Sequence, residues 1–226
     1  MCSEVKTIKE KYSYNFEKFL KINNEACPQR IDIIKELETL AENLVSNILK
    51  NDNSIERIKN NEVAIPIIGI CKHFGFKIYD MDFEFLSEKN KEYKNASGMI
   101  AISQKFKSLF NTDKVLFLNK TESFEHSRFT IAHEIAHYLF DFNEKKEFEY
   151  LNFYRTEENY INNIEKRASR FAAALLMPKN IFKHEYDSLP NDITYYELIT
   201  KLSEIFMAPT TAVDIRVKEL KELGVI

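Results

Sequence analysis

The sequence predicts an α+β fold in which a small β-sheet is followed by a helical half of the chain. Short segments rich in apolar and β-branched residues lie between positions 76 and 119, as expected for strands. Longer segments on both sides repeat apolar residues with the period of a helix. We expect a helical N-terminal extension over residues 1–60, a central domain over residues 61–182, and a C-terminal helical subdomain over residues 183–226.

The composition excludes several classes of protein. The chain has 226 residues, 44% hydrophobic and 30% charged, which is enough for one core with an appendage. Its 32 Lys and Arg residues against 35 Asp and Glu leave a net charge of −3, so direct binding to nucleic acid is not predicted. The cysteines are odd in number and irregularly spaced, which indicates free thiols in a reducing compartment: Cys2, Cys27 and Cys71. With neither a signal peptide nor a long apolar run, we expect a cytoplasmic protein without membrane contact, and its oligomeric state stays open.

The N-terminal part contains one amphipathic helix. Pro28 suits a helix start, and apolar residues then repeat at helical spacing as far as Lys50: Ile34, Leu37, Ala41, Leu44, Val45 and Ile48. Residues 51–61 are dense in Asn and charge and are predicted as a linker. We expect the helix to pack on the rest of the protein, with a partner-binding surface as the alternative. The preceding aromatic residues are expected on the same core: Tyr12, Tyr14, Phe16 and Phe19.

The sheet is predicted from three segments. A short helix over residues 65–74 is closed by Gly75 as a left-handed cap. The strands follow at residues 76–83, 97–103 and 115–119. A charged loop over residues 84–95 connects the first two.

The next segment carries the HExxH motif on a predicted helix. His133 and His137 are four residues apart, so their side chains are neighbours on one helix face. Two imidazoles placed in this way can bind one zinc ion. Glu134 points away from that pair and can act as a general base on a water molecule without being a ligand. Two histidines satisfied inside an apolar core are the alternative, which the rarity of the motif disfavours.

A catalytic zinc site usually needs a third protein ligand. The extended motif that ends in a third histidine is excluded, because Phe140 and Asn143 occupy its Gly and His positions. In the predicted helix over residues 159–177, Glu165 lies within the apolar stripe, and a buried carboxylate needs a cation. Glu165 is therefore our candidate, with Glu157 and Glu158 as the alternatives. Pairing of Glu165 with Lys166 or Arg170, or extension of its side chain to solvent, is the other interpretation and would leave the third ligand unassigned.

These two segments resemble a known family. The run RFTIAHEIAHYLF, from Arg128, and the run EKRASRFAAALLMP, from Glu165 to Pro178, are similar to the motif blocks of the ImmA/IrrE zinc metallopeptidases. The resemblance implies a zincin-like domain with one Zn²⁺ on His133, His137 and Glu165, and Glu134 as the catalytic base. Such enzymes often cut a helix-turn-helix transcriptional repressor. The chain departs from the pattern at Ser169, where the family more often has Asn or Asp.

Further residues could act beside the metal. By resemblance, the strand over residues 98–103 is the sheet edge that receives a substrate chain, with an ordinary solvent-facing edge as the alternative. Tyr154 or Arg155 would suit stabilisation of a developing oxyanion, although a surface contact is the more common role of such loop residues. Arg128 is expected to form a structural ion pair, and His184 to be exposed and inert.

The C-terminal segment predicts two helices, over residues 193–206 and 210–223, separated by Met207, Ala208 and Pro209 and closed by Gly224. Helix pairs of this kind occur in DNA-binding proteins. Residues 193–226 carry four basic and five acidic side chains, too few positive charges to hold phosphates.

The two motif segments together predict zinc-dependent cleavage of a protein substrate. The alternative is a zinc-binding module without activity that sequesters a transcription regulator or belongs to a toxin–antitoxin pair.

Overall fold

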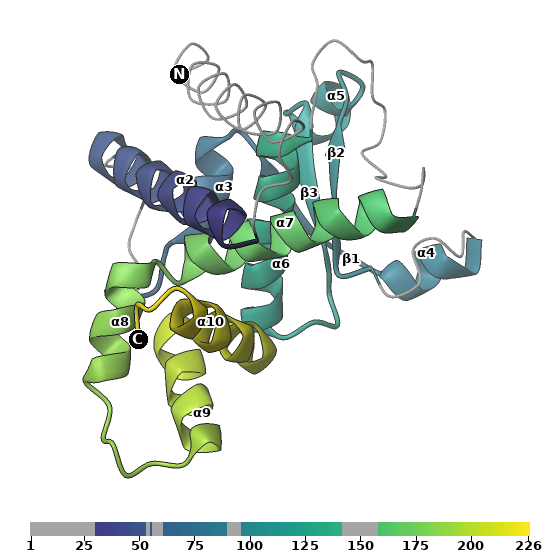
Figure 1. Cartoon of the computed structure of the whole chain (residues 1–226). Helices are drawn as coiled ribbons and strands as arrows, with labels where there is room; N and C mark the ends of the chain where they lie inside the picture. The colour runs from purple at the N-terminus through teal and green to yellow at the C-terminus, as the bar shows by residue number, and fades with distance from the viewer. Residues whose placement is uncertain (1–29, 53–54, 56–60, 90–95, 142–157) are drawn as a thin grey trace.

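The computed structural model of the chain describes residues 1–226 except for 1–29, 53–54, 56–60, 90–95 and 142–157 (Figure 1). It has a three-stranded sheet, with helices that precede and follow the strands in the sequence. This arrangement confirms the predicted α+β class. The first described elements are α2 (Arg30–Asn51), α3 (Ile67–His73), β1 (Lys77–Met81), α4 (Phe83–Lys89), β2 (Gly98–Ile102), α5 (Phe106–Phe110) and β3 (Lys114–Asn119). They are followed by α6 (Phe124–Phe140), α7 (Glu158–Leu176), α8 (Lys179–Asp187), α9 (Tyr195–Phe206) and α10 (Thr210–Glu222).

The sheet has the strand order β1-β3-β2, with β3 parallel to β1 and antiparallel to β2. Strands β1 and β2 lie within the segments that the sequence predicts, and β3 begins one residue earlier than predicted, at Lys114. The central strand β3 buries four consecutive residues, Val115 to Leu118, because both of its faces are covered. A continuous apolar run is typical of a strand in this position.

Strand β2 lies at one edge of this sheet. The amide of Ser103 donates to the carbonyl of Asp113, and the amide of Asn119 donates to that of Ser97, both at 2.9 Å. In an antiparallel ladder every second residue bonds to the partner strand, so the backbone groups of Gly98, Ile100 and Ile102 point away from β3. Helix α6 packs against β2 and β3, and the outward-pointing amide of Ile100 donates to the Glu134 carboxylate of this helix.

The core forms where α6 and α7 pack against each other (Figure 1). Both helices bury alanines fully, Ala132 and Ala136 on α6 and Ala168 and Ala172 on α7. Small side chains let two helix backbones approach closely, which brings the polar residues along the same contact within reach of each other. Helix α3 packs on α6 and α2 packs on α7, so one apolar cluster joins all four helices.

Helix α2 buries all six apolar residues that its sequence pattern predicts for one face. That face packs against α7, as expected. Pro28 and the aromatic residues at positions 12, 14, 16 and 19 lie outside the described residues. The division of the chain at residue 60 stays a prediction.

Arg216 of α10 is fully buried and joins three helices. Its guanidinium donates to the carbonyl of Met177, at the end of α7, from Nε (3.0 Å) and Nη2 (2.7 Å). It also forms a two-point ion pair with the buried Glu38 of α2, in which Nη2 lies 2.8 Å from Oε2. The pairing of two buried charges ties the C-terminal helices to the core.

Replacing Arg216 with Met is expected to lower the free energy of unfolding by about 3–5 kcal/mol, because it leaves the Glu38 carboxylate buried without its cation. Denaturant unfolding would measure the change. Lys218→Met is the matched control, since Lys218 is 67% exposed in its pair with Asp214 and is expected to cost about 1 kcal/mol or less. Equal losses in the two variants would contradict this account of the buried pair.

Several short helices are absent from the sequence prediction. The loop predicted over residues 84–95 is wrong for its first part, because α4 extends to Lys89. Helices α5 and α8 were also not predicted, and Pro178, which ends α7 as expected, is the N-cap of α8. These helices have seven, five and nine residues, which is too short for an apolar period to be recognised. The predicted left-handed cap at Gly75 is confirmed by its φ of +87°.

The C-terminal pair is formed by α9 and α10, as predicted. Thr194 and Glu197 form a capping box at the start of α9, and Met207 turns the chain with a φ of +49°. Arg128 of α6 holds this turn: it donates to the carbonyls of Met207 and Ile65, both at 2.9 Å. The prediction of an ion pair for Arg128 is therefore wrong, although its role is structural; burial lowers the pKa of its guanidinium to about 10.

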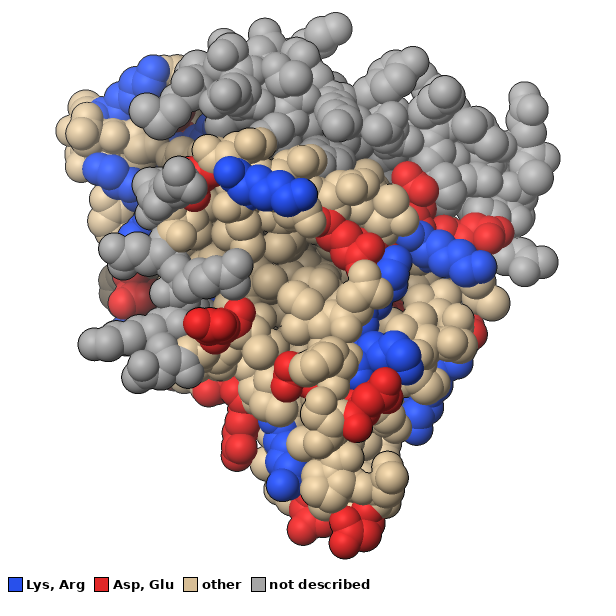
Figure 2. All heavy atoms as spheres, turned by 90° about the vertical axis from the view of Figure 1, so that its left-hand side faces the viewer, with Lys and Arg blue, Asp and Glu red and all other residues tan. Residues whose placement is uncertain are grey.

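The surface shows no segregation of charge on the side that carries α2 and α8. Basic and acidic side chains are interspersed over the described part of this face (Figure 2). His184 of α8 is 77% exposed, as expected. None of the described helices has the length and apolarity that a membrane span requires.

Candidate metal site

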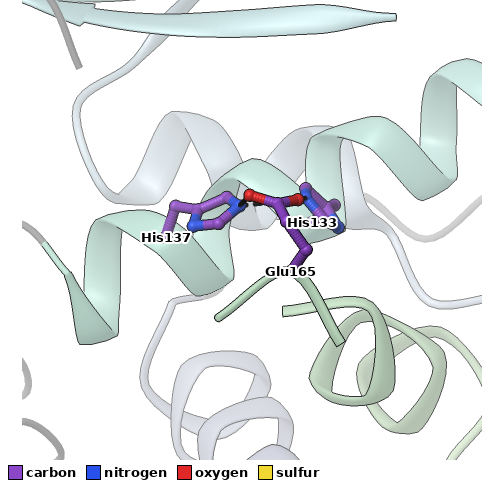
Figure 3. Close-up of side chains that lie close together, drawn as sticks. All are labelled: His133, His137 and Glu165. Carbon is purple, nitrogen blue, oxygen red and sulfur yellow. Dashed lines mark hydrogen bonds and ion pairs between the residues drawn. The ribbon is translucent and has the colours of Figure 1, made fainter. Parts of the chain in front are cut away.

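Three side chains from two helices converge at one point. His133 and His137 project from α6, and Glu165 projects toward them from α7 (Figure 3). The Nε2 atoms of the two histidines are 2.9 Å apart, and the Glu165 carboxylate lies 3.0 Å from His133 and 3.5 Å from His137. One ligand atom from each residue lies within 4.8 Å of the other two. The structure thus brings together the three residues that the sequence proposes as ligands.

Both histidines are held by their other ring nitrogen. Nδ1 of His137 donates to Oδ2 of Asp141 at 2.9 Å, and Nδ1 of His133 lies 3.3 Å from Oγ of Ser169. With a metal ion bound, a proton on each Nδ1 would leave the two Nε2 lone pairs directed at the common point, which is the arrangement seen in metal-binding histidines. Ser169 thus makes the supporting contact despite its departure from the family pattern.

Asp141 is a residue of this site that the sequence analysis missed. Its side chain is only 8% exposed, and its other oxygen accepts a hydrogen bond from Arg167 of α7. The signal in the sequence is a carboxylate four residues after His137, the same spacing that relates the two histidines. Because Arg167 is two residues from Glu165, the pair also fixes α7 against the end of α6.

Replacing Asp141 with Asn is expected to lower the affinity for zinc about 10- to 100-fold, because His137 loses the carboxylate that orients its ring. Competition with a chromogenic chelator would measure the affinity. Asp187→Asn, at a 54% exposed site paired with Lys183, is the control and should leave zinc affinity unchanged. An unchanged affinity in the Asp141 variant would show that the carboxylate does not support His137.

The electrostatics of the site favour a cation. Burial by itself lowers the pKa of His137, but its hydrogen bonds with Asp141 and Glu165 outweigh this effect and raise the pKa to about 10. Burial raises the pKa of the Glu165 carboxyl, whereas hydrogen bonds from both histidines hold it well below its usual range. The surroundings of these groups therefore favour positive charge at the point where the three side chains meet, which a bound cation would supply.

Glu134 lies beside this group and has a different environment. It is partly buried, its carboxylate accepts a hydrogen bond from the backbone N–H of Ile100 in β2, and it does not belong to the ligand cluster. Removal from water raises the pKa of its carboxyl, against the opposing effect of His137 and His133. A carboxylate with a raised pKa next to a metal site suits a group that takes up and returns a proton.

Cys71 of α3 is buried near Glu134 and does not belong to the cluster. Burial, with a contribution from the Glu134 carboxylate, raises the pKa of its thiol to about 12. The thiol is therefore protonated at neutral pH and unsuited to binding a metal.

Other predictions differ from the structure or lie outside it. Glu165 is 44% exposed, so the predicted burial of this carboxylate is wrong, and solvent reaches the ligand cluster from its side. Glu157, Tyr154 and Arg155 lie outside the described residues. Glu158 begins α7, but its side chain also lies outside the described part of the structure.

The donor set fits zinc. Two imidazole nitrogens and one carboxylate are the ligands found in catalytic zinc sites that keep a position open for water. Thiolates are absent from the cluster of described residues, as is a fourth protein ligand that would close a structural site. An exposed third ligand on the rim agrees with a site that small molecules or a peptide chain can reach.

Comparisons with known proteins place the chain in a family. No curated protein matches it significantly. Among solved structures, a Mycobacterium tuberculosis transcriptional regulator aligns with 81% of this chain at 14% identity and a TM-score of 0.47. This chain covers 46% of that protein, about half of its length. The sequence model of the IrrE N-terminal-like domain matches residues 71–218, which include all the residues of the candidate site and indicate a metallopeptidase. The chain therefore belongs to the Peptidase_M78 family, as the ImmA/IrrE motifs in its sequence predicted.

Proposed function

We propose that the protein is a zinc-dependent endopeptidase. His133, His137 and Glu165 would hold one Zn²⁺, and Glu134 would act as the general acid and base. The observation that carries the proposal is the position of Glu134: a carboxylate with a raised pKa lies beside three converging ligands without being one of them. A site that only stabilises the fold has no need of such a group.

Zinc bound at such a site polarises the scissile carbonyl and lowers the pKa of water toward about 7. Glu134 takes a proton from the attacking water and then returns it to the leaving amine, so that the carboxylate is regenerated after each cycle. Asp141 and Ser169 keep the histidine rings in place during this cycle. The partial exposure of Glu165 leaves a route for the substrate.

The edge of β2 suits a bound peptide. Gly98, Ile100 and Ile102 direct their backbone groups away from β3, and the amide of Ile100 lies at the Glu134 carboxylate. A substrate in extended conformation can pair with this edge by backbone hydrogen bonds, and the contact of Ile100 with Glu134 would bring that substrate beside the proposed base. This arrangement supports the assignment of β2 as the substrate edge.

The family resemblance further implies a substrate in the cytoplasm, a helix-turn-helix transcriptional repressor. The mixed charges on the described surface of α2 and α8 agree with a protein partner rather than with nucleic acid (Figure 2). The rival function is that of a zinc-binding module that sequesters a transcription regulator without cutting it.

Incubation of the zinc-loaded chain with the purified product of the neighbouring regulator gene, with and without a chelator, would separate the two functions. Cleavage gives fragments that disappear when the chelator is present. Sequestration gives a stable complex without fragments, and that result would refute the proposed peptidase. Size-exclusion chromatography of the same samples detects the complex.

A further inference from the structure

A second polar cluster lies at the start of β2. Oγ of Ser97 donates to Oε1 of Glu122 at 3.0 Å and lies 3.1 Å from Nε2 of His126. Because the Ser97 hydroxyl gives its proton to Glu122, Nε2 of His126 must be the donor in the second bond. Oε2 of Glu122 lies 3.8 Å from the same Nε2, beyond hydrogen-bond distance, so this oxygen and Nδ1 of a neutral His126 can still accept hydrogen bonds from a ligand. The side chains of His126 and Glu122 are 43% and 28% exposed, so a ligand can reach them.

The cluster lies in line with the proposed metal site. Strand β2 and helix α6 run side by side in the same direction, as three successive contacts show. Ser97 meets His126, Gly98 lies against Thr130, and the amide of Ile100 meets Glu134. A Cβ on Gly98 would lie 2.4 Å from Cγ2 of Thr130, so strand and helix are in close contact there.

The distance between the two sites follows from helix geometry. His126 precedes His133 by seven residues, two turns of helix, and so lies on the same face of α6 about 10 Å away. An extended peptide advances about 3.3 Å per residue. A substrate strand along β2 would therefore bring the third residue from its cleaved bond to Ser97, Glu122 and His126.

We propose that Ser97, Glu122 and His126 form a specificity subsite that binds a Lys or Arg side chain three residues from the cleaved bond. This inference rests on the proposed peptidase function. Glu122 supplies the negative charge, and the hydroxyl of Ser97 holds its carboxylate in one orientation. The remaining acceptors on Glu122 and His126 match the several N–H donors of a cationic side chain.

The test is cleavage of a proteome-derived peptide library by the zinc-loaded full chain, with the cut sites read by mass spectrometry. We expect Lys and Arg to be enriched about fivefold at the third residue on one side of the cut, the size of effect typical of a partly exposed ion pair. Glu122→Gln should remove the enrichment, and Glu122→Lys should replace it with enrichment of Asp and Glu. Glu125→Gln is the control: Glu125 directly precedes His126 on α6 and lies about 100° around the helix from it, so this variant should leave the enrichment intact.

Each outcome decides the proposal. Cleavage without a preference at the third residue on either side, or a preference that survives both Glu122 variants, would overturn the subsite while leaving the peptidase function in place. A wild-type chain that binds zinc but cuts no peptide or regulator would overturn both. Reversal of the preference by Glu122→Lys cannot arise from a general loss of structure, so it would establish direct contact between position 122 and the substrate.

Discussion

Glu134→Gln is expected to lower the rate of peptide cleavage about 10²- to 10⁴-fold and to leave zinc bound. Gln keeps the shape of Glu and can still accept the hydrogen bond from the amide of Ile100. It cannot accept a proton from water at neutral pH. The loss should therefore fall on kcat, while the dissociation constant of zinc stays near that of the wild type because Glu134 is not a ligand.

The same variant should also be at least as stable as the wild type. Burial raises the pKa of the Glu134 carboxyl, so the ionised form at pH 7 destabilises the folded state, and the neutral amide removes this cost. Thermal unfolding and zinc content, measured on the same sample, would separate lost chemistry from lost structure. If Glu134→Gln cleaves at the wild-type rate, the general base lies elsewhere; if it loses zinc, Glu134 is closer to the metal than its position on α6 indicates.

The ligands were predictable because their positions depend on local geometry. His133 and His137 need only the pitch of one helix to meet. Glu165 was identified from the periodicity of α7, and the structure places it at the histidines even though 44% of its side chain is exposed. The premise that this carboxylate is buried was therefore wrong, whereas its position on the helix face was correct.

The polar pairs that join one helix to another were not predictable from the same information. Arg167 reaches Asp141 only because α7 crosses the end of α6 at one particular height, and no local pattern specifies that height. The pair of Arg216 and Glu38 likewise depends on how distant helices pack, since the two residues are 178 positions apart in the chain. The sequence predicts each helix separately but not how the helices pack on one another. The partners of such buried polar residues depend on that packing.

Glu165→Gln is expected to lower the affinity for zinc more than 100-fold. Loss of a residue that only hydrogen-bonds a metal ligand costs about 10- to 100-fold, and loss of the ligand itself should cost more. The amide is the same size as the carboxylate but is neutral, and it leaves the zinc ion with two imidazole ligands. Titration with a competing chelator would measure the affinity. Glu204→Gln, at an exposed position of α9, is the control and should bind zinc as the wild type does.

The metal-free form of the Glu165→Gln variant gives a second readout. Hydrogen bonds from His133 and His137 hold the pKa of the Glu165 carboxyl below its usual range, so the ionised group stabilises the fold at pH 7 and loses this effect as the pH falls through its folded pKa. The variant should therefore unfold at a lower temperature than the wild type near pH 7, and the difference should shrink toward acidic pH. Unchanged zinc stoichiometry together with this loss of stability would mean that Glu165 pairs with protonated histidines, and that the third ligand is Glu157 or Glu158.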